Sequence, residues 1–496
     1  MKSGSSILFV AALLFGVTAP AFSQGLATAL STTTTSYQSQ SASQSASGSP
    51  SGPVSSQNPY SGSVPSQPVP GVLQLSLQDA IDRGLKQNLG ELLASADITS
   101  SRGQRWQQLS ALLPHVNATP YVDVSQVNLR EFGFNFSPPP SSGFFIPSIV
   151  GPFSYFDARA NLTQNLFDLN AIENARAATQ RLKSSEHIYG DARDLVVLAA
   201  GYNYLLCIAD EARIQTADAQ VKTAQALYQQ AADQVQAGTS PAIDALRNHV
   251  ELQTRQQQLI EAKNNFAIQK LTLARVIGLA PGQEFNLTDK SPYAPFEGIT
   301  VDEALKRAFA SRSDYQAAMA DVRAAEYSHK AALAERYPSL SFDADYGLAG
   351  QHADQSHGVM DVRANLTVPI LTGGATHGDI LQTQAQLEQS HERLDNLRGQ
   401  IDADVRTALF NLESSAEQVA VAKSNIDLAE QTLTQSRDRF AAGVTDTVEV
   451  VQAQEQVASA NEQYISSLYN FNYAKISLAR AMGAAEIRVK QYFKGN

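Results

Sequence analysis

The chain has 496 residues, of which 43% are hydrophobic and only 17% are charged, below the roughly 25% of an ordinary soluble domain. Its formal net charge of −11 argues against a nucleic acid as partner, because that role needs a basic surface. The sequence contains none of the signatures of serine hydrolases, zinc proteases, Walker-type NTPases or dinucleotide-binding enzymes. It therefore indicates no enzyme, and we predict no catalytic residue, cofactor or metal site.

The N-terminus has the composition of a secretory signal peptide, which we assign to residues 1–23. Lys2 provides the positive end, residues 7–19 (ILFVAALLFGVTA) form a short apolar core, and Ala21-Phe22-Ser23 fits the small-x-small cleavage rule. Residues 24–72 follow as a Ser-, Gln- and Pro-rich segment, which we expect to be a disordered leader because it contains too few apolar side chains to fold. The sequence thus predicts an exported protein without a transmembrane helix.

The remainder of the chain is an internal duplication. Three segments recur in the same order: LSLQDAIDRGLKQN (75–88) and ITVDEALKRAFASR (299–312), RANLT (159–163 and 363–367), and LARVIG (273–278) and LARAMG (478–483). Matches in a constant order indicate repeated structural units. We place the first repeat at 73–283, an inter-repeat linker at 284–298, the second repeat at 299–484 and a C-terminal tail at 485–496. The first repeat carries an extra aromatic and Pro-rich loop, FGFNFSPPPSSGFFIPSIVGPF.

Each repeat contains one predicted β-hairpin, at residues 119–167 and 339–371, in which apolar and polar residues alternate. The polar positions are Asp157, Arg159, Asn161, Asp343, Asp345, Asp361, Arg363 and Asn365. A soluble sheet with its apolar face on a core is one interpretation. The other is a set of membrane-spanning strands, each about 9–11 residues long, whose charged face lines a water-filled lumen.

Four strands are too few for a membrane barrel, since the smallest have about 8 and open edges are not tolerated in lipid. Three chains would provide about 12 strands, an even number. The second interpretation therefore requires a homotrimer.

Long helices follow each hairpin, and each is interrupted once, near residues 238–244 and 443–449. No proline occurs between Ala171 and Ser240, or after Ile370. Apolar residues at spacings of three and four, typical of a coiled coil, are Leu394, Leu397, Ile401, Val405, Ala408, Leu412, Ala416 and Val419.

The first break, AGTSPAID, contains the residues that end one helix and begin another. Gly238 can adopt the left-handed conformation that ends a helix. We expect Thr239 or Ser240 to cap the next helix, with Pro241 at its first position. Asp244 then lies where a helix dipole favours a negative charge.

The second break, AGVTDTVE, repeats this design with Gly443 as the terminating residue. Asp446 and Glu449 have the spacing of a capping box. Both acids thus have a purely structural interpretation as helix caps.

The duplicated order of helix, hairpin and interrupted long helix resembles the TolC-like outer-membrane efflux proteins, as do the AG breaks and the LAR-x-x-G ends. The resemblance covers Leu75 to about Lys490. It implies a mainly α-helical fold in which each chain of a homotrimer gives four strands to a 12-stranded barrel surrounded by outer-membrane lipid. The helices continue as a periplasmic tunnel that meets a periplasmic adaptor protein and an inner-membrane efflux pump. The breaks are then turns at the periplasmic tip.

Several roles for tip residues follow from this resemblance alone. Asp244, Asp446 and Glu449 become candidates for the tip gate, with Glu449 aligned to an acid that narrows the closed tip in relatives. A second acidic position in relatives is Gln452 here, so the doubled acidic ring is not expected. Candidate adaptor contacts are Gly238, Thr239, Gly443, Val444 and Thr445.

The function we predict is a passive outer-membrane duct of a Gram-negative bacterium, exporting small toxic molecules. One alternative is the exit duct of a protein-secretion system. A second is a periplasmic coiled-coil scaffold without a barrel. An exported enzyme would require a site that the sequence does not contain.

Overall fold

The computed structural model describes residues 58–133, 147–289, 296 and 298–492, with side chains up to residue 489. The predicted signal peptide and most of the predicted leader lie outside these residues. The helices are α1 Leu77–Gln87, α2 Leu89–Ser110, α3 Leu169–Gln236, α4 Ala242–Ile277, α5 Val301–Ser311, α6 Ser313–Ala334, α7 Ala375–Ala441, α8 Thr447–Ala481 and α9 Ala485–Tyr492. The strands are β1 Leu73–Leu75, β2 His115–Asn128, β3 Ile149–Phe167, β4 Phe285–Leu287, β5 Ser339–Gly350 and β6 His357–Thr367. Two 3-10 turns are η1 Pro59–Ser61 and η2 Ala353–Gln355.

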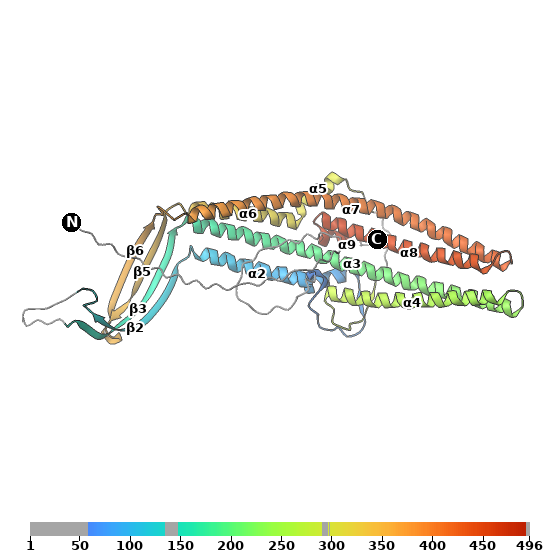
Figure 1. Ribbon diagram of the computed structural model, residues 1–496, viewed down its shortest axis with the longest axis horizontal. Coiled ribbons are helices and arrows are strands. Elements are labelled where there is room, and N and C mark those ends of the chain that lie inside the picture. Colours follow the sequence, from blue (N-terminus) through green and yellow to red (C-terminus); the bar gives the residue numbers. More distant parts are fainter. Residues whose placement is uncertain (1–57, 134–146, 290–295, 297, 493–496) are drawn as a thin grey trace, which may run out of the picture. The chain divides into compact units, whose positions relative to one another are not determined.

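The two halves of the chain have the same plan (Figure 1). Helices α1 and α5 each have 11 residues, and α2 and α6 each have 22. The long helices α3 and α7 have 68 and 67 residues, and α4 and α8 have 36 and 35. The predicted fold class, duplicated long-helix hairpins with four strands, is confirmed.

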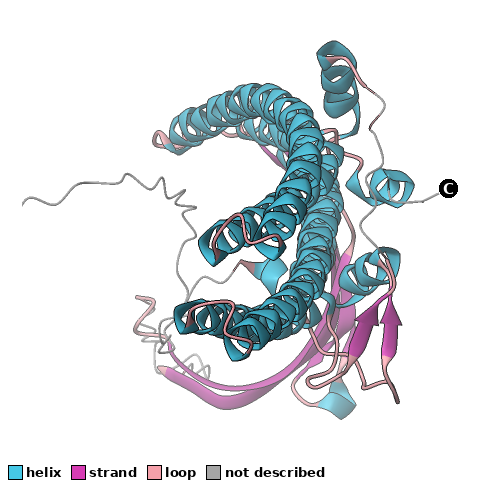
Figure 2. Ribbon diagram, turned by 90° about the vertical axis from the view of Figure 1, so that its right-hand side faces the viewer, coloured by secondary structure: helices cyan, strands magenta, loops and turns pink. Residues whose placement is uncertain are grey.

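Four strands form one antiparallel sheet in the order β2-β3-β5-β6, so the two hairpins meet along the β3–β5 seam. Strands β2 and β6 are the edges. The sheet lies at one end of the long helices, and the α3–α4 and α7–α8 turns lie at the other (Figure 1). Figure 2 shows that the sheet is curved. The extra loop expected at residues 132–153 of the first repeat is not all loop, because residues 149–153 belong to β3. Residues 134–146 are outside the described part of the chain.

The predicted apolar stripe of α7 is confirmed as a helix–helix contact. Ile401, Val405 and Leu412 are buried in a cluster with Phe471 and Leu478 of α8. Side chains spaced by three and four residues fall on one helix face, and that face of α7 packs along α8. A heptad-like spacing thus specifies the antiparallel pairing of two helices far longer than propensity alone would stabilise.

A second cluster joins both repeats around the middle of α3. Val196, Tyr204 and Cys207 are fully buried beside Ile476 of α8 and Leu273 of α4. Burial raises the pKa of the Cys207 thiol, so this side chain is a core residue, as expected, and a weak nucleophile. Helix α3 is the one described helix that could cross a membrane by length and composition, and 56% of its apolar window is buried inside the structure.

The segment before the first repeat differs from the expected disordered leader over residues 58–72. The Val64 amide donates to Gln87 O at 2.8 Å, and the Ser66 amide donates to Gly278 O at 2.9 Å. Strand β1 then pairs in parallel with β4, and β4 lies inside the predicted linker. Helix ends leave carbonyl groups without intrahelical partners, and this segment satisfies those at the ends of α1 and α4.

The C-terminal tail also has structure, because α9 occupies most of it. The Arg193 guanidinium of α3 donates to both carboxylate oxygens of Glu486, at 3.0 and 2.7 Å. Such a bidentate pair is among the stronger side-chain contacts. It attaches the C-terminal tail to the long helix of the first repeat.

Candidate functional site

The four-stranded sheet has one polar and one apolar face. The register pairs most polar residues of each strand with polar residues of its neighbour, and the apolar residues with apolar ones. On the polar face, Asn161 is opposite Asp345, which is in turn opposite Asp361. Asp343 is opposite Arg363. The structure therefore brings all eight predicted lumen-facing residues onto the same face.

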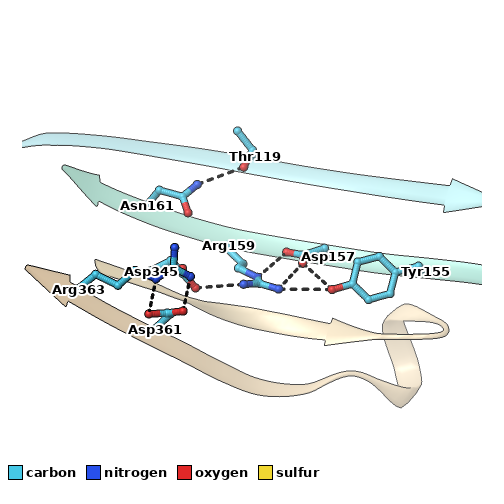
Figure 3. A network of polar contacts seen from close by, with 8 residues as sticks. All are labelled: Thr119, Tyr155, Asp157, Arg159, Asn161, Asp345, Asp361 and Arg363. Atoms are coloured by element: carbon cyan, nitrogen blue, oxygen red, sulfur yellow. Dashed lines mark hydrogen bonds and ion pairs between the residues drawn. The ribbon is translucent and has the colours of Figure 1, made fainter. Parts of the chain in front are cut away.

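Arg159 is the centre of a network on this face that links the two repeats (Figure 3). Its Nε donates to Asp157 Oδ1 at 3.0 Å, and its Nη1 donates to Asp345 Oδ2 at 3.3 Å. The Tyr155 hydroxyl donates to Asp157 Oδ2 at 2.9 Å. Asp157 and Arg159 are on β3, whereas Asp345 is on β5. The network therefore spans the seam between the hairpins.

A glycine opposite Arg159 allows the close approach of strands at this point. Gly347 is paired with Arg159 across the seam. A Cβ at Gly347 would lie 2.2 Å from Ala158 O, a distance that no side chain tolerates. The glycine is therefore required by packing between β3 and β5, without any need for a positive φ.

The remaining polar residues pair within and between strands. Arg363 donates from Nε to Asp361 Oδ1 at 3.0 Å. Asn365 Nδ2 donates to Asp343 Oδ2 at 2.7 Å, and Asn161 Nδ2 donates to Thr119 Oγ1 at 3.3 Å (Figure 3). The Asp361–Arg363 pair is the more exposed of the ion pairs on this face, and the Asp157–Arg159 pair the more buried.

The opposite face of the same sheet is apolar and uncovered in the single chain. Its large side chains include Val116, Val122, Val124, Tyr346, Met360, Val362 and Leu366, each more than half exposed. Exposed apolar patches of this size mark a surface that contacts lipid or another protein. Within the described part of the chain, these apolar side chains are therefore left without a covering layer, unlike those of a sheet packed on a core.

The α3–α4 tip is a helix-ending turn of the Schellman type. Gly238 has φ 73°. The amide of Gly238 donates to Val235 O at 3.0 Å, and that of Thr239 donates to Gln234 O at 2.9 Å. The positive φ explains the glycine, since other residues rarely adopt that conformation.

The predicted caps of α4 are wrong in detail. Pro241 occupies the N-cap itself, without a side-chain hydrogen bond. The Thr239 hydroxyl donates to Gln234 O at 3.0 Å, and the Ser240 hydroxyl donates to Gln234 Oε1 at 3.3 Å. Both hydroxyls therefore bond back to Gln234 near the end of α3, that of Thr239 to the main-chain carbonyl and that of Ser240 to the side chain. Asp244 lies in the first turn of α4, 3.8 Å from Arg247 Nη1.

The α7–α8 tip has the same backbone turn. Gly443 has φ 68°; its amide donates to Phe440 O at 3.0 Å, and the Val444 amide donates to Arg439 O at 2.9 Å. Asp446 caps α8 by accepting from the Val448 amide at 3.1 Å, as expected.

Glu449 does not complete the expected capping box, because its carboxylate is drawn away from the N-cap. Oε1 lies 3.2 Å from Arg439 Nη1 and accepts from the Ser436 hydroxyl at 3.3 Å. The Thr445 hydroxyl donates to Oε2. Glu449 thus ties α8 to the last turns of α7. Arg439 and Ser436 were not predicted from the sequence; they lie about one and about two helical turns before Gly443.

The two tips are also in apolar contact. Leu227 of α3 packs with Phe440 of α7 and Val450 of α8. The helical hairpins lie side by side when viewed from the tips (Figure 2). Any movement that separates the hairpins must therefore expose these side chains. Among the described residues, no group of three or more His, Cys, Asp or Glu side chains could hold a metal ion.

Comparison with known proteins agrees with this architecture. The model of the family named outer membrane efflux protein matches residues 92–279 and 304–484. The alkaline protease secretion protein AprF of Pseudomonas aeruginosa is 25% identical over 327 residues, covering 63% of this chain and 66% of AprF, just under two thirds of its length. The outer membrane efflux protein BepC of Brucella suis is 23% identical, over 65% of this chain and 71% of BepC.

Among solved structures, the CmeC outer membrane channel of Campylobacter jejuni is similar to the chain. The TM-score is 0.70 at 17% identity, with 84% of this chain and 88% of CmeC covered. At this identity the likeness concerns the fold. The fold is that of a TolC-like outer-membrane channel.

Proposed function

Since the chain belongs to the outer membrane efflux protein family, whose place is the Gram-negative outer membrane, we propose that it forms a passive homotrimeric channel-tunnel. Each chain contributes four strands to a closed 12-stranded barrel. A periplasmic adaptor protein holds an inner-membrane efflux pump to the helical tips. Small molecules enter the tunnel from this pump and leave through the barrel. The pump supplies the energy, so the channel itself needs no catalytic residue.

The observation that carries the proposal is the sheet with an apolar exposed face, a charged face and two open edges. An exposed sheet edge cannot remain in lipid, where backbone groups must be satisfied within the protein. The strands alternate in direction across β2, β3, β5 and β6. The β6 edge of one chain can therefore pair in antiparallel fashion with β2 of the next, and three chains close the barrel with the apolar side toward lipid.

The tips support the periplasmic end of this arrangement. They lie at the end of the long helices opposite to the sheet (Figure 1). Gly238, Thr239, Gly443, Val444 and Thr445 are proposed adaptor contacts. Asp244, Asp446 and Glu449 are proposed to shape the tip gate. Opening would follow from adaptor binding that favours separated hairpins, since a ligand shifts an equilibrium only through its different affinities for the two states.

Native mass spectrometry and planar-bilayer conductance of purified protein test the proposal. We expect a trimer that inserts and shows discrete conductance steps. A variant without the turn residues 238–240 and 443–445 should conduct at least as well, because it lacks the narrowest part of the proposed duct. A monomer that conducts in neither form would overturn the proposal. Salt or urea washing of membranes should leave the protein bound, whereas a periplasmic scaffold would be released.

A second candidate function is the exit duct of a protein-secretion system. It is favoured by the similarity to AprF, which is named for alkaline protease secretion. Expression in a host that lacks its own channel separates the two functions. Restored resistance to toxic small molecules supports efflux, and restored release of a protease alone supports secretion.

A further inference from the structure

We propose that a cavity between the two helical hairpins is a binding site for a small neutral molecule with a carboxamide group and an apolar body. The cavity has a volume of about 560 Å³ and is lined by side chains of α3, α4, α7 and α8. Small-molecule sites typically have volumes of roughly 300–1,000 Å³. A passive duct needs no such site in its wall, so the inference goes beyond the proposed function.

Small side chains on α3 leave the space between the hairpins unfilled. Ala212, Thr216 and Ala219 line the cavity, and their spacings of four and three residues place them on one face of the helix. Leu433 of α7 and Val457 of α8 line the same cavity. An apolar body that covers these side chains removes their surface from water, which favours binding.

Two buried polar atoms at this cavity lack a hydrogen-bond partner. Gln454 is 7% exposed, and its Oε1 accepts no hydrogen bond from any described residue. The Nε of Arg437 is also buried and donates to none of the acceptors that the structure describes. Both side chains line the cavity. Buried polar atoms are unfavourable without a partner, so a molecule that bonds both atoms gains from satisfying them.

Arg437 and Gln454 lie at the same level of the α7–α8 pair. Phe440 of α7 and Val450 of α8 pack in one cluster near the tip. The two helices are antiparallel, so three residues back along α7 and four residues forward along α8 lead to Arg437 and Gln454. Both are therefore about one helical turn further from the tip, where a single head group can contact the two.

The two unpaired atoms require partners of opposite kind. The Arg437 Nε–H is a donor and needs an acceptor, whereas Gln454 Oε1 is an acceptor and needs a donor. A carboxamide carries a carbonyl oxygen and an N–H on the same carbon, and so supplies both. A carboxylate lacks the donor, and an ammonium group lacks the acceptor.

The charges around the cavity favour a neutral head group. Arg255 is 3% exposed, and its Nε donates to Glu251 Oε1 at 2.6 Å. Its Nη2 lies 2.7 Å from Glu455 Oε1. Arg437 lines the same cavity as Glu430. The lining thus has charges of both signs, and an ionic ligand would lose its hydration without gaining an excess of opposite charge.

The test is fluorine NMR of para-fluorobenzamide with the purified full chain, since binding broadens the line of the probe. The matched probe is N,N-dimethyl-para-fluorobenzamide, which keeps the carbonyl and lacks the N–H donor. Wild type should bind the primary amide about three-fold to ten-fold more tightly, the effect of one neutral hydrogen bond. The primary amide should also slow amide hydrogen exchange in the segments of α3 and α8 that line the cavity.

Variants at the two polar atoms assign the preference to this site. Gln454→Leu removes the acceptor, so the preference for the primary amide should disappear. Gln454→Met is a second variant if leucine disturbs the packing. Arg437→Met should weaken both probes by a similar factor, because both carry the carbonyl that Nε bonds. Gln456→Leu is the control and should keep the preference, because Gln456 is exposed on α8 and does not line the cavity.

Unchanged helix content and thermal unfolding are required of each variant before titration. The inference is overturned if wild type binds the two probes alike, or if both Gln454 variants keep the preference. Equal broadening by wild type and all variants would also overturn it, because it would show uptake into detergent only. So would slower exchange confined to segments away from the cavity. None of these measurements depends on conductance, so a failure of the proposed duct is recognised separately.

Discussion

The two helical tips have one backbone conformation and two different sets of side-chain contacts. Both turns have a glycine at positive φ and the same pair of closing hydrogen bonds. In the α3–α4 tip, hydroxyls bond back to α3 and the N-cap of α4 has no side-chain bond. In the α7–α8 tip, Asp446 caps α8 and Glu449 ties it to α7. Duplication thus preserved the turn, which depends on glycine, while the contacts across it diverged.

The largest effect is expected where the tips are alike. Gly238→Ala and Gly443→Ala should each destabilise the local turn by about 1–2 kcal/mol, the cost of a left-handed conformation for an L-residue. Amide hydrogen exchange at each tip should therefore become about ten-fold faster, since about 1.4 kcal/mol corresponds to a factor of ten. Gly→Asn at the same positions is the control and should have a smaller effect, because Asn adopts this conformation more readily. Clearly unequal effects of Ala at the two tips would contradict the equivalence of the turns.

An intermediate loss of stability is expected on removing the side-chain N-cap of α8, which α4 lacks. Asp446→Ala should cost about 1 kcal/mol, typical of a lost N-cap, and should accelerate exchange of the amides in the first turn of α8. Ser240→Ala is the matched control, because the Ser240 hydroxyl does not cap α4. Asp446→Asn should retain most of the protection. Equal acceleration by Ser240→Ala and Asp446→Ala would show that the caps do not distinguish the tips.

The smallest effect is expected from the ion pair across the α7–α8 tip. The side chains of Arg439 and Glu449 are 56% and 35% exposed, and pairs at such positions contribute about 0.2–1 kcal/mol. A double-mutant cycle with Arg439→Gln and Glu449→Gln, followed by hydrogen exchange at the tip, should give a coupling within that range. The coupling should shrink as salt screens the charges. Strictly additive effects would mean that Glu449 is held by Ser436 and Thr445 alone.

The sheet allows the same kind of comparison between its two faces. Period-two alternation in the sequence correctly placed Asp157, Arg159 and Asp345 on one face. It could not show that Arg159 of one repeat lies within 3.3 Å of Asp345 of the other. That distance depends on which strands are neighbours and in which register, and alternation within a single strand carries no information about either.

The sequence by itself determined the fold class, through three local signals. Alternating residues indicated strands, apolar residues at spacings of three and four indicated paired helices, and two Ala-Gly breaks indicated where the long helices are interrupted. Each signal lies within a few consecutive turns or residues, and the corresponding conformation depends on local sterics and on which face is apolar.

Only the tertiary structure decided the contacts between distant segments. Residues 58–72 look disordered by composition, yet their backbone pairs with the ends of α1 and α4. Glu449 has the spacing of a capping residue, yet Arg439 and Ser436 on α7 hold its carboxylate. In both cases a local preference competes with partners that only the folded chain brings within reach. The hydrogen bonds available in the fold prevail, because unsatisfied backbone groups and carboxylates take the partners that packing places beside them.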